Sequence, residues 1–228
     1  YEVERFMFEG KFPYAIGYGM TETAPLLSGC TPKITRFRCA GYNLPGQEMK
    51  ILNPNPVTGE GEILVKGSNV MVGYYKEPEL TESMFVDGWL RTGDLGVFDS
   101  HGYIQIMGRT KNMILSASGE NIYPEEIEAL INKNEFVLES MVYEMKGKLV
   151  ARVHLNKELV EGYYAGMKQS AKDWQHNAEE KSKRVMDDIM AHVNSKVARF
   201  ARLSAVVEQP EPFEKTPTQK IKRFIYNK

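Results

Sequence analysis

Short apolar runs separated by turn residues fill positions 46–109, and this pattern constrains the fold more than any other feature of the chain. Strand-like runs such as G-E-I-L-V at 61–65 and V-M-V-G-Y at 70–74 alternate with turn signals such as Asp87-Gly88. Strands need only a few residues, and Gly and Asp tolerate the backbone conformations of tight turns. The spacing therefore predicts a small β-barrel or sandwich-like subdomain.

Helical spacing begins to alternate with strands after about position 110. Pro124 stands where the first residue of a helix is favoured, and Val185, Ile189 and Val193 recur on one helix face. A hairpin is predicted at 141–155. The predicted fold class is α+β: the β-barrel-like part is followed by a small domain with a mixed sheet and flanking helices. We place the boundary between residues 110 and 111.

The bulk composition excludes several classes of function. The 228 residues carry a net charge of −1, with 42% hydrophobic and 26% charged residues, as in ordinary globular proteins. Such a chain has no electrostatic case for binding nucleic acid. No stretch approaches the roughly 20 apolar residues that cross a bilayer. Cys30 and Cys39 form no disulfide framework, so a reducing, cytoplasmic location is expected.

The motif G-Y-G-M-T-E-T at 17–23 carries groups suited to a nucleotide. Its glycines allow a ligand to approach the backbone, and Tyr18 offers a ring on which a purine could stack. Thr21 offers a hydroxyl to a phosphate oxygen, and Glu22 offers a hard oxygen ligand to Mg²⁺. The same residues also fit a Gly-rich turn before a helix, so this motif alone leaves both interpretations open.

Two later motifs add a carboxylate and a cation. W-L-R-T-G-D ends at Asp94, and an ionised carboxylate, which only accepts hydrogen bonds, can take two from a ribose diol. G-R-T-K-N contains Arg109, which could bridge ribose or phosphate. Taken singly, the first also fits an aspartate in a β-turn and the second a surface cation.

The last two motifs are loops. S-G-E-N-I-Y-P-E-E-I-E at 118–128 places a glycine-containing loop before a helix. T-P-T-Q-K-I-K-R at 216–223 is a Thr/Pro loop that ends in clustered cations. Alone, they fit a strand–loop–helix connection and a solvated basic tail.

These five motifs, in this order, resemble those of the adenylate-forming superfamily of acyl-CoA synthetases, peptide-synthetase adenylation domains and luciferases. The resemblance extends from about Gly17 to Arg223. It implies that residues 1–110 are the C-terminal end of a large nucleotide-binding domain and that residues 111–228 are a mobile C-terminal domain. It also implies ATP, Mg²⁺ and coenzyme A as cofactor and co-substrates.

The resemblance assigns roles to individual residues. The nucleotide-binding residues it implies are Tyr18, Gly19, Thr21, Asp94 and Arg109. Glu22 looks like the Mg²⁺ ligand, and Lys111 falls at the hinge between the domains. Gly119 and Glu120 lie on the loop that lines the thiol tunnel. Lys220 matches the catalytic lysine that bridges the substrate carboxylate and the α-phosphate, and Thr21 is grouped with it as catalytic.

Details of the last motif favour one branch of the superfamily. Many members have glycine where this chain has Gln219, and P-E-P-F at 210–213 precedes the motif, as in long-chain acyl-CoA synthetases. The predicted function is an ATP-dependent long-chain fatty acid–CoA ligase. Two alternatives stay open: another acyl-CoA synthetase or an enzyme that loads a carrier-protein thiol, and a non-catalytic relic that binds a nucleotide or a partner. Retention of Thr21, Glu22, Asp94, Arg109 and Lys220 argues against the relic.

The sequence lacks the phosphate loop and the acyl pocket that the superfamily carries upstream of these motifs. We therefore expect the chain to be a piece of a longer enzyme and to be inactive by itself. The expected partners are small molecules: a fatty acid, ATP and coenzyme A. Use of long-chain acids leaves a peripheral membrane contact open.

Overall fold

The computed structural model describes residues 2–166, 178–217 and 219–226 of the chain. The chain divides into two compact units, Tyr1–Lys111 and Asn112–Lys228. The roles predicted for the two parts, a nucleotide-binding end and a mobile domain, remain predictions. None of the described helices is long and apolar enough to cross a membrane.

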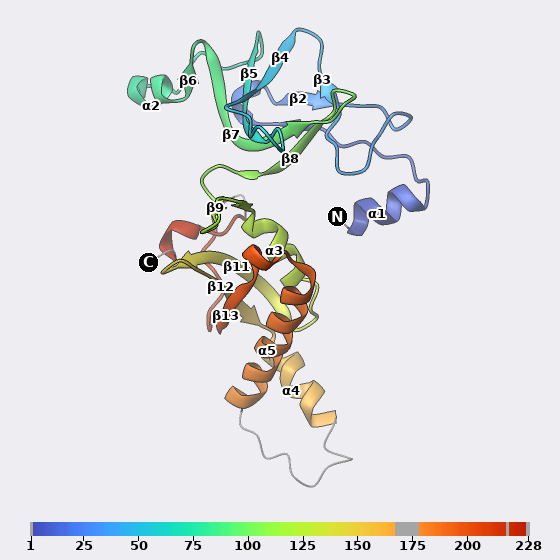
Figure 1. Cartoon of the computed structure of the whole chain (residues 1–228), viewed down its shortest axis with the longest axis vertical. Coiled ribbons are helices and arrows are strands. Elements are labelled where there is room, and N and C mark those ends of the chain that lie inside the picture. Colours follow the sequence, from blue (N-terminus) through green and yellow to red (C-terminus); the bar gives the residue numbers. More distant parts are fainter. Residues whose placement is uncertain (1, 167–177, 218, 227–228) are drawn as a thin grey trace. The chain divides into compact units, whose positions relative to one another are not determined.

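The first unit is built mainly from strands (Figure 1). Its five-stranded sheet is antiparallel, in the order β4-β5-β7-β6 with β8 paired to β7. The strands of this sheet are β4 (Gln47–Leu52), β5 (Gly61–Gly67), β6 (Phe85–Val86), β7 (Trp89–Phe98) and β8 (Ile104–Arg109). A three-stranded sheet consists of β1 (Tyr18–Gly19), β2 (Leu26–Gly29) and β3 (Tyr42–Asn43). The helices are α1 (Glu2–Glu9), the 3-10 helix η1 (Thr21–Thr23) and α2 (Pro78–Ser83).

The core of the first unit lies between these sheets. Ile63 and Val65 of β5 pack with Leu90 of β7, Ile104 of β8 and Tyr18 of β1. These contacts between strands build the β-rich subdomain that the sequence predicted. One predicted strand is wrong: residues 70–74 form no strand. The neighbouring residues Val70 and Met71 both pack against the core, whereas Val72 is fully exposed. The apolar side chains therefore do not alternate between core and solvent.

The second unit has the predicted mixed sheet with flanking helices. The strands β11 (Val137–Met145) and β12 (Lys148–Leu155) form the predicted hairpin, and β13 (Leu203–Glu208) pairs parallel to β12. A two-stranded sheet is formed by β9 (Ile114–Leu115) and β10 (Asn121–Ile122). The helices are α3 (Pro124–Ile131), α4 (Lys157–Gly166), α5 (Ala178–Lys196), η3 (Arg199–Ala201) and η4 (Arg223–Ile225).

Both faces of the three-stranded sheet are covered. Val142 and Val153 face the helices, where they pack with Ile127 of α3 and Ile189 of α5. On the opposite face, the neighbouring residues Met141, Tyr143 and Val150 pack against Phe213 of the C-terminal tail. Successive strand residues point to opposite faces of a sheet. The apolar residues on one face therefore pack against the helices, and those on the other face pack against the C-terminal tail.

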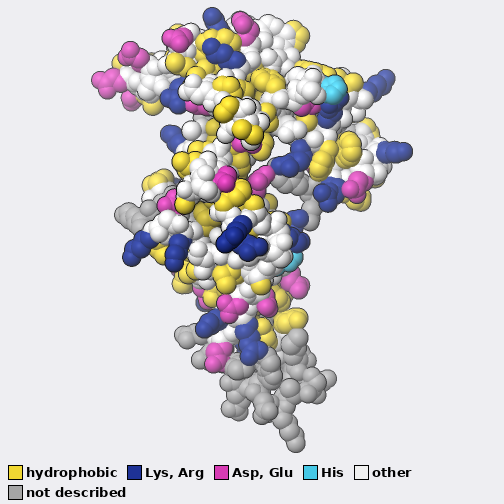
Figure 2. Space-filling view, viewed as in Figure 1, with side chains coloured by type: hydrophobic (Ala, Val, Ile, Leu, Met, Phe, Trp, Pro, Cys, Tyr) yellow, Lys and Arg dark blue, Asp and Glu magenta, His cyan; other side chains and the backbone are white. Residues whose placement is uncertain are grey.

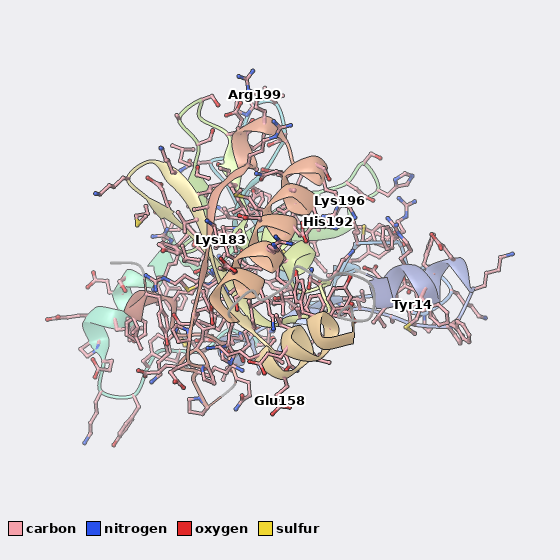
Figure 3. All side chains as sticks on the ribbon, turned by 90° about the horizontal axis from the view of Figure 1, so that it is seen from below. Tyr14, Glu158, Lys183, His192, Lys196 and Arg199 are labelled. Carbon is pink, nitrogen blue, oxygen red and sulfur yellow. The ribbon has the colours of Figure 1, made fainter. Side chains whose placement is uncertain are left out.

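Charged side chains of both signs are mixed on the surface. On the face drawn in Figure 2, basic and acidic side chains alternate, and they form no broad area of one sign among the described residues. Lys183, His192 and Lys196 lie exposed along α5, with Arg199 in the turn after it (Figure 3). Asp187 and Asp188 are exposed on the same helix, so this basic stretch is partly offset.

Candidate functional site

Asp94 lies at a bulge in the sheet, where β7 contains more residues than the strand opposite. The flanking register pairs are Leu64 with Arg91 and Glu62 with Leu95. One residue of β5 therefore faces residues 92–94 of β7. Gly93 has a φ of +70°, a left-handed conformation that glycine adopts at little cost. Bulges re-aim side chains, and here the carboxylate of Asp94 is turned inward, with 5% of the residue exposed.

Two other predicted nucleotide-binding residues contact this carboxylate. The Tyr18 hydroxyl donates to Oδ2 of Asp94 at 2.7 Å, and Nε of Arg109 lies 2.7 Å from Oδ1. Burial and the Asp94 carboxylate raise the pKa of Tyr18, so its hydroxyl remains a donor at neutral pH. The structure thus brings together Tyr18, Asp94 and Arg109 from three strands.

A carboxylate such as that of Asp94 can accept hydrogen bonds from several partners at once. Each carboxylate oxygen has two lone pairs, and the Arg109 side chain, which is 49% exposed, can move aside. Tyr18 itself is buried, so the stacking of a purine on its ring stays a prediction.

Gly19 occupies a place where the chain folds back on itself. It pairs with Leu26 of β2, and a Cβ at this position would lie 1.9 Å from the carbonyl oxygen of Pro25. Only glycine fits at that distance. This close return positions η1, with Thr21 and Glu22, directly after β1.

The Glu22 side chain is oriented by a tyrosine that sequence reasoning did not select. The Tyr74 hydroxyl donates to Oε1 of Glu22 at 2.7 Å. The Tyr74 backbone N–H in turn donates to Oγ1 of Thr81 at 2.9 Å, which holds the segment 70–74 close to α2. Burial and the hydrogen bond to Glu22 raise the pKa of Tyr74 to about 12. A neutral donor therefore fixes one oxygen of the carboxylate.

A cavity of about 500 Å³ opens beside these groups within the first unit. Charged or hydroxyl-bearing side chains that line it include Glu22, Glu62, Tyr74, Arg91, Arg109 and Lys111. Thr110 also lines it, and its Oγ1 is buried without a hydrogen-bond partner. The volume lies in the range of small-molecule sites, and the unpaired hydroxyl is a group that a polar ligand could satisfy.

The residues around the cavity suit a Mg²⁺ ion only if phosphate oxygens of a ligand complete its coordination. Among the described residues, no group of three or more His, Cys, Asp or Glu side chains could hold a metal. Mg²⁺ bound with nucleotides is commonly held by one or two carboxylates, with phosphate oxygens and waters completing the octahedron. Glu22 at the cavity wall suits that arrangement.

In the second unit, Gly119 and Glu120 form a tight loop. Gly119 has a φ of +87°, and the Glu120 carboxylate accepts hydrogen bonds from the hydroxyls of Ser116 and Ser118. These bonds lower the pKa of Glu120, with Ser116 contributing most. The loop is thus held by its own side chains. Its predicted contact with a thiol stays a prediction, as does the hinge role of Lys111, the last residue of the first unit.

Lys220 is exposed. It lies in a turn whose flanking residues on both sides contact the rest of the second unit. The Thr216 N–H donates to the Lys220 carbonyl oxygen at 2.8 Å, and the Lys220 N–H donates to Oγ1 of Thr216 at 3.2 Å. Before the turn, Phe213 is buried against the sheet. After it, Nη1 and Nη2 of Arg223 lie 2.8 and 2.5 Å from the carboxylate of Glu128 on α3.

The residues that sequence reasoning missed act through contacts between distant segments. Besides Tyr74, they include Glu62 and Arg91, whose side chains form a paired contact across β5 and β7. One signal was present in the sequence: a glutamate within the apolar strand run G-E-I-L-V is costly to bury without a partner.

Comparisons with known proteins show which enzymes the chain resembles. The family model of the AMP-binding enzymes matches residues 2–75. A 2-succinylbenzoate–CoA ligase of Bacillus pumilus (strain SAFR-032) is 40% identical over 139 residues, which cover 59% of this chain and 28% of that protein. A long-chain-fatty-acid–CoA ligase of Salmonella typhimurium is 41% identical over 129 residues, 54% of this chain and 23% of that protein. The match thus spans about a quarter of the length of these curated relatives.

Solved structures give the same result for the fold. The o-succinylbenzoate CoA synthetase (MenE) of Bacillus subtilis, in complex with its acyl-adenylate intermediate, matches all of this chain and 43% of its own, with a TM-score of 0.76 at 26% identity. The same enzyme in complex with ATP and a magnesium ion matches 98% of this chain with a TM-score of 0.72 at 27% identity. The predicted α+β fold is therefore confirmed.

Proposed function

We propose that the protein joins a carboxylic acid to coenzyme A at the expense of ATP, because the chain is similar to AMP-binding enzymes over residues 2–75 and to enzymes named as CoA ligases and CoA synthetases. In the first step, a carboxylate oxygen attacks the α-phosphorus of ATP, the bond to the β-phosphate oxygen breaks, and pyrophosphate leaves. In the second, the thiolate of coenzyme A attacks the acyl carbon, and AMP leaves. The relatives named as CoA ligases support the overall reaction, and the similar enzyme solved in complex with an acyl-adenylate intermediate supports adenylation as its first step.

The chain's own residues supply three parts of the first step. Asp94 accepts hydrogen bonds from the ribose hydroxyls, with Arg109 beside it to contact ribose or phosphate. Glu22 would hold a Mg²⁺ ion, which would supply positive charge beside the phosphates when ATP is bound. Attack of the carboxylate on the α-phosphate brings two negative groups together, and the positive charge of Lys220 offsets their repulsion. Its turn is attached to the second unit, so it can be withdrawn before the thiol attacks.

One observation carries this proposal above the alternatives. Tyr18, Asp94 and Arg109, from three separate motifs, meet within hydrogen-bonding distance, and Arg109 lines a cavity that Glu22 also lines. A relic that no longer binds a nucleotide has no need for a buried carboxylate whose cationic partner lines a cavity, because burial of charge is costly.

For the acid, we propose a long-chain fatty acid. The motif T-P-T-Q-K-I-K-R with Gln219 in the place of glycine, and P-E-P-F before it, support this choice, as does the similarity to the Salmonella enzyme. The similarity to 2-succinylbenzoate–CoA ligases favours a second candidate, an aromatic or aryl-dicarboxylic acid. The location we propose is cytoplasmic, with a peripheral membrane contact if the acid is drawn from lipid.

The test is the identity of the thioester formed by the natural-length protein. The protein is incubated with ATP, Mg²⁺ and coenzyme A together with an equimolar mixture of saturated acids of increasing length and 2-succinylbenzoate. Mass spectrometry then identifies the acyl-CoA products. We expect long-chain acyl-CoA to dominate. Dominance of succinylbenzoyl-CoA would replace the first candidate by the second, and no thioester with any acid would refute both.

A further inference from the structure

Glu62 makes a close polar contact at the edge of the bulge that presents Asp94, where it pairs with Leu95. It is 8% exposed, although it belongs to an exposed type of residue. Its Oε2 lies 2.6 Å from Nη2 and 3.1 Å from Nε of Arg91. Its Oε1 accepts the backbone N–H of Gly93 at 3.3 Å. The carboxylate thus binds the residue before the bulge and a residue inside it.

The bulge needs such an external acceptor because its own ladder is interrupted. Between the Glu62–Leu95 and Leu64–Arg91 pairs, residues 92–94 have one residue of β5 opposite them. Oγ1 of Thr92 bonds to the carbonyl oxygen of Ile63 at 2.8 Å and accepts the Asp94 N–H at 3.1 Å. The Gly93 N–H goes to Glu62. Thr92 and Gly93 are thus bonded directly to β5, and Asp94 is linked to β5 through the Thr92 hydroxyl.

We propose that Glu62 is a positioning residue for the nucleotide: its carboxylate clamps Arg91 and Gly93, and this clamp sets the direction in which Asp94 meets the ribose. The inference rests on the proposed nucleotide-binding role of Asp94. Glu62 itself need not contact ATP. It acts through the backbone of the bulge, where a shift of a fraction of an ångström would displace both Asp94 oxygens together.

The experiment measures ATP affinity of the natural-length protein by calorimetry without acid or coenzyme A. The variants are Glu62→Gln, Asp94→Asn and the double variant. Glutamine keeps the size of the side chain but presents an N–H₂ group to the Arg91 guanidinium, so the clamp opens. We expect the Kd for ATP to rise about tenfold in Asp94→Asn, since charge-assisted hydrogen bonds are lost, and about three- to tenfold in Glu62→Gln.

The double variant separates a positioning role from general weakening. If Glu62 acts through Asp94, its replacement adds nothing once the Asp94 charge is gone, and the double variant should match Asp94→Asn within about twofold. Steady-state kinetics give a second readout: Glu62→Gln should raise the KM for ATP while kcat and the KM for the acid stay within about twofold. A variant that is partly unfolded would lower kcat and leave the KM for ATP unchanged.

Arg36→Gln is the matched control. It removes an ion pair of the same unit at the other end of β7, where Nη1 of Arg36 lies 3.1 Å from Oδ2 of Asp99. Its Kd for ATP should stay at the wild-type value. If Asp94→Asn binds ATP normally, the proposed nucleotide site itself fails. If Asp94→Asn weakens binding but Glu62→Gln does not, or if the two effects multiply in the double variant, the positioning role of Glu62 alone is overturned.

Discussion

Replacing Arg223 with methionine should destabilise the second unit in a way that depends on pH. The Arg223 guanidinium binds both oxygens of Glu128, and Oε1 of Glu128 also accepts the Val142 N–H at 2.7 Å. Methionine would keep the apolar part of the side chain and leave the Glu128 carboxylate buried beside one backbone donor. Removing one partner of a buried pair costs about 3–5 kcal/mol.

The expected loss is smaller than that range because the pair is not fully enclosed. The side chains of Arg223 and Glu128 are 19% and 10% exposed, and the Val142 N–H remains bonded to the carboxylate. We therefore expect the free energy of unfolding to fall by about 2–3 kcal/mol at pH 7.5.

The sign of the pH dependence follows from Glu128. Burial raises the pKa of its carboxyl above the ordinary value of 4.5, even though Arg223 lowers it. Without Arg223 the folded-state pKa rises further. A carboxyl whose pKa is higher in the folded state favours folding at low pH, and this contribution is lost as pH rises through the folded-state pKa. The difference between wild type and Arg223→Met should therefore shrink as pH falls from 7.5 toward 5.

Hydrogen exchange of the amides of β11 gives a local measurement, because this strand contains the Val142 N–H. Opening free energies are compared between wild type and Arg223→Met at pH 5 and 7.5, each corrected for intrinsic exchange. Glu128→Gln combined with Arg223→Met is the control: it leaves no buried charge and should recover part of the loss without pH dependence. Equal protection of β11 in wild type and Arg223→Met, or a loss that is the same at both pH values, would refute the reasoning.

Substitutions at four other positions test separate features of the account. Gln219 has a φ of +62°, so Gln219→Gly should leave acyl-CoA formation within about twofold, whereas Gln219→Val, which is strained by about 1–2 kcal/mol in that conformation, should reduce it. Gly19→Ala would place a Cβ against Pro25 and should lower the unfolding free energy of the first unit by at least about 1–3 kcal/mol, measured by hydrogen exchange of β2; unchanged protection would contradict the close approach. In the natural-length protein, Lys220→Ala should lower adenylation by about 10²–10³-fold while acyl transfer from supplied adenylate persists, and Lys111→Pro should slow only transfer; equal damage to both steps by either variant would remove the assigned role.

The parts of the fold that sequence patterns predicted are those set by local chemistry. Pro124 begins α3, and β11 and β12 form the hairpin predicted at 141–155, because helix starts and strand alternation depend on neighbours along the chain. The segment 70–74 has strand-like composition but forms no strand. Its last residue, Tyr74, lines the cavity and bonds to Glu22. The structure of the segment depends on a contact with a residue 52 positions away, which no local pattern contains.

The candidate site shows the same division. Ordered motifs selected Tyr18, Asp94 and Arg109, and the structure brings them together. The clamp that Glu62 forms could not be read from the sequence, because it depends on the register of β5 against β7 and on a bulge that only pairing reveals. The sequence therefore identified the residues whose polar groups suit a ligand. The residues that orient them could be identified only from the pairing of the strands.

The most direct test of the account is acid-dependent exchange of labelled pyrophosphate into ATP by the natural-length protein. The reaction reverses adenylation and needs no coenzyme A, so it isolates the step to which Asp94, Glu22 and Lys220 are assigned. We predict exchange that requires both Mg²⁺ and a carboxylic acid, is fastest with long-chain acids and is nearly abolished by Lys220→Ala. Exchange that is absent with every acid tested, or that continues at the wild-type rate in Lys220→Ala, would contradict the central claim.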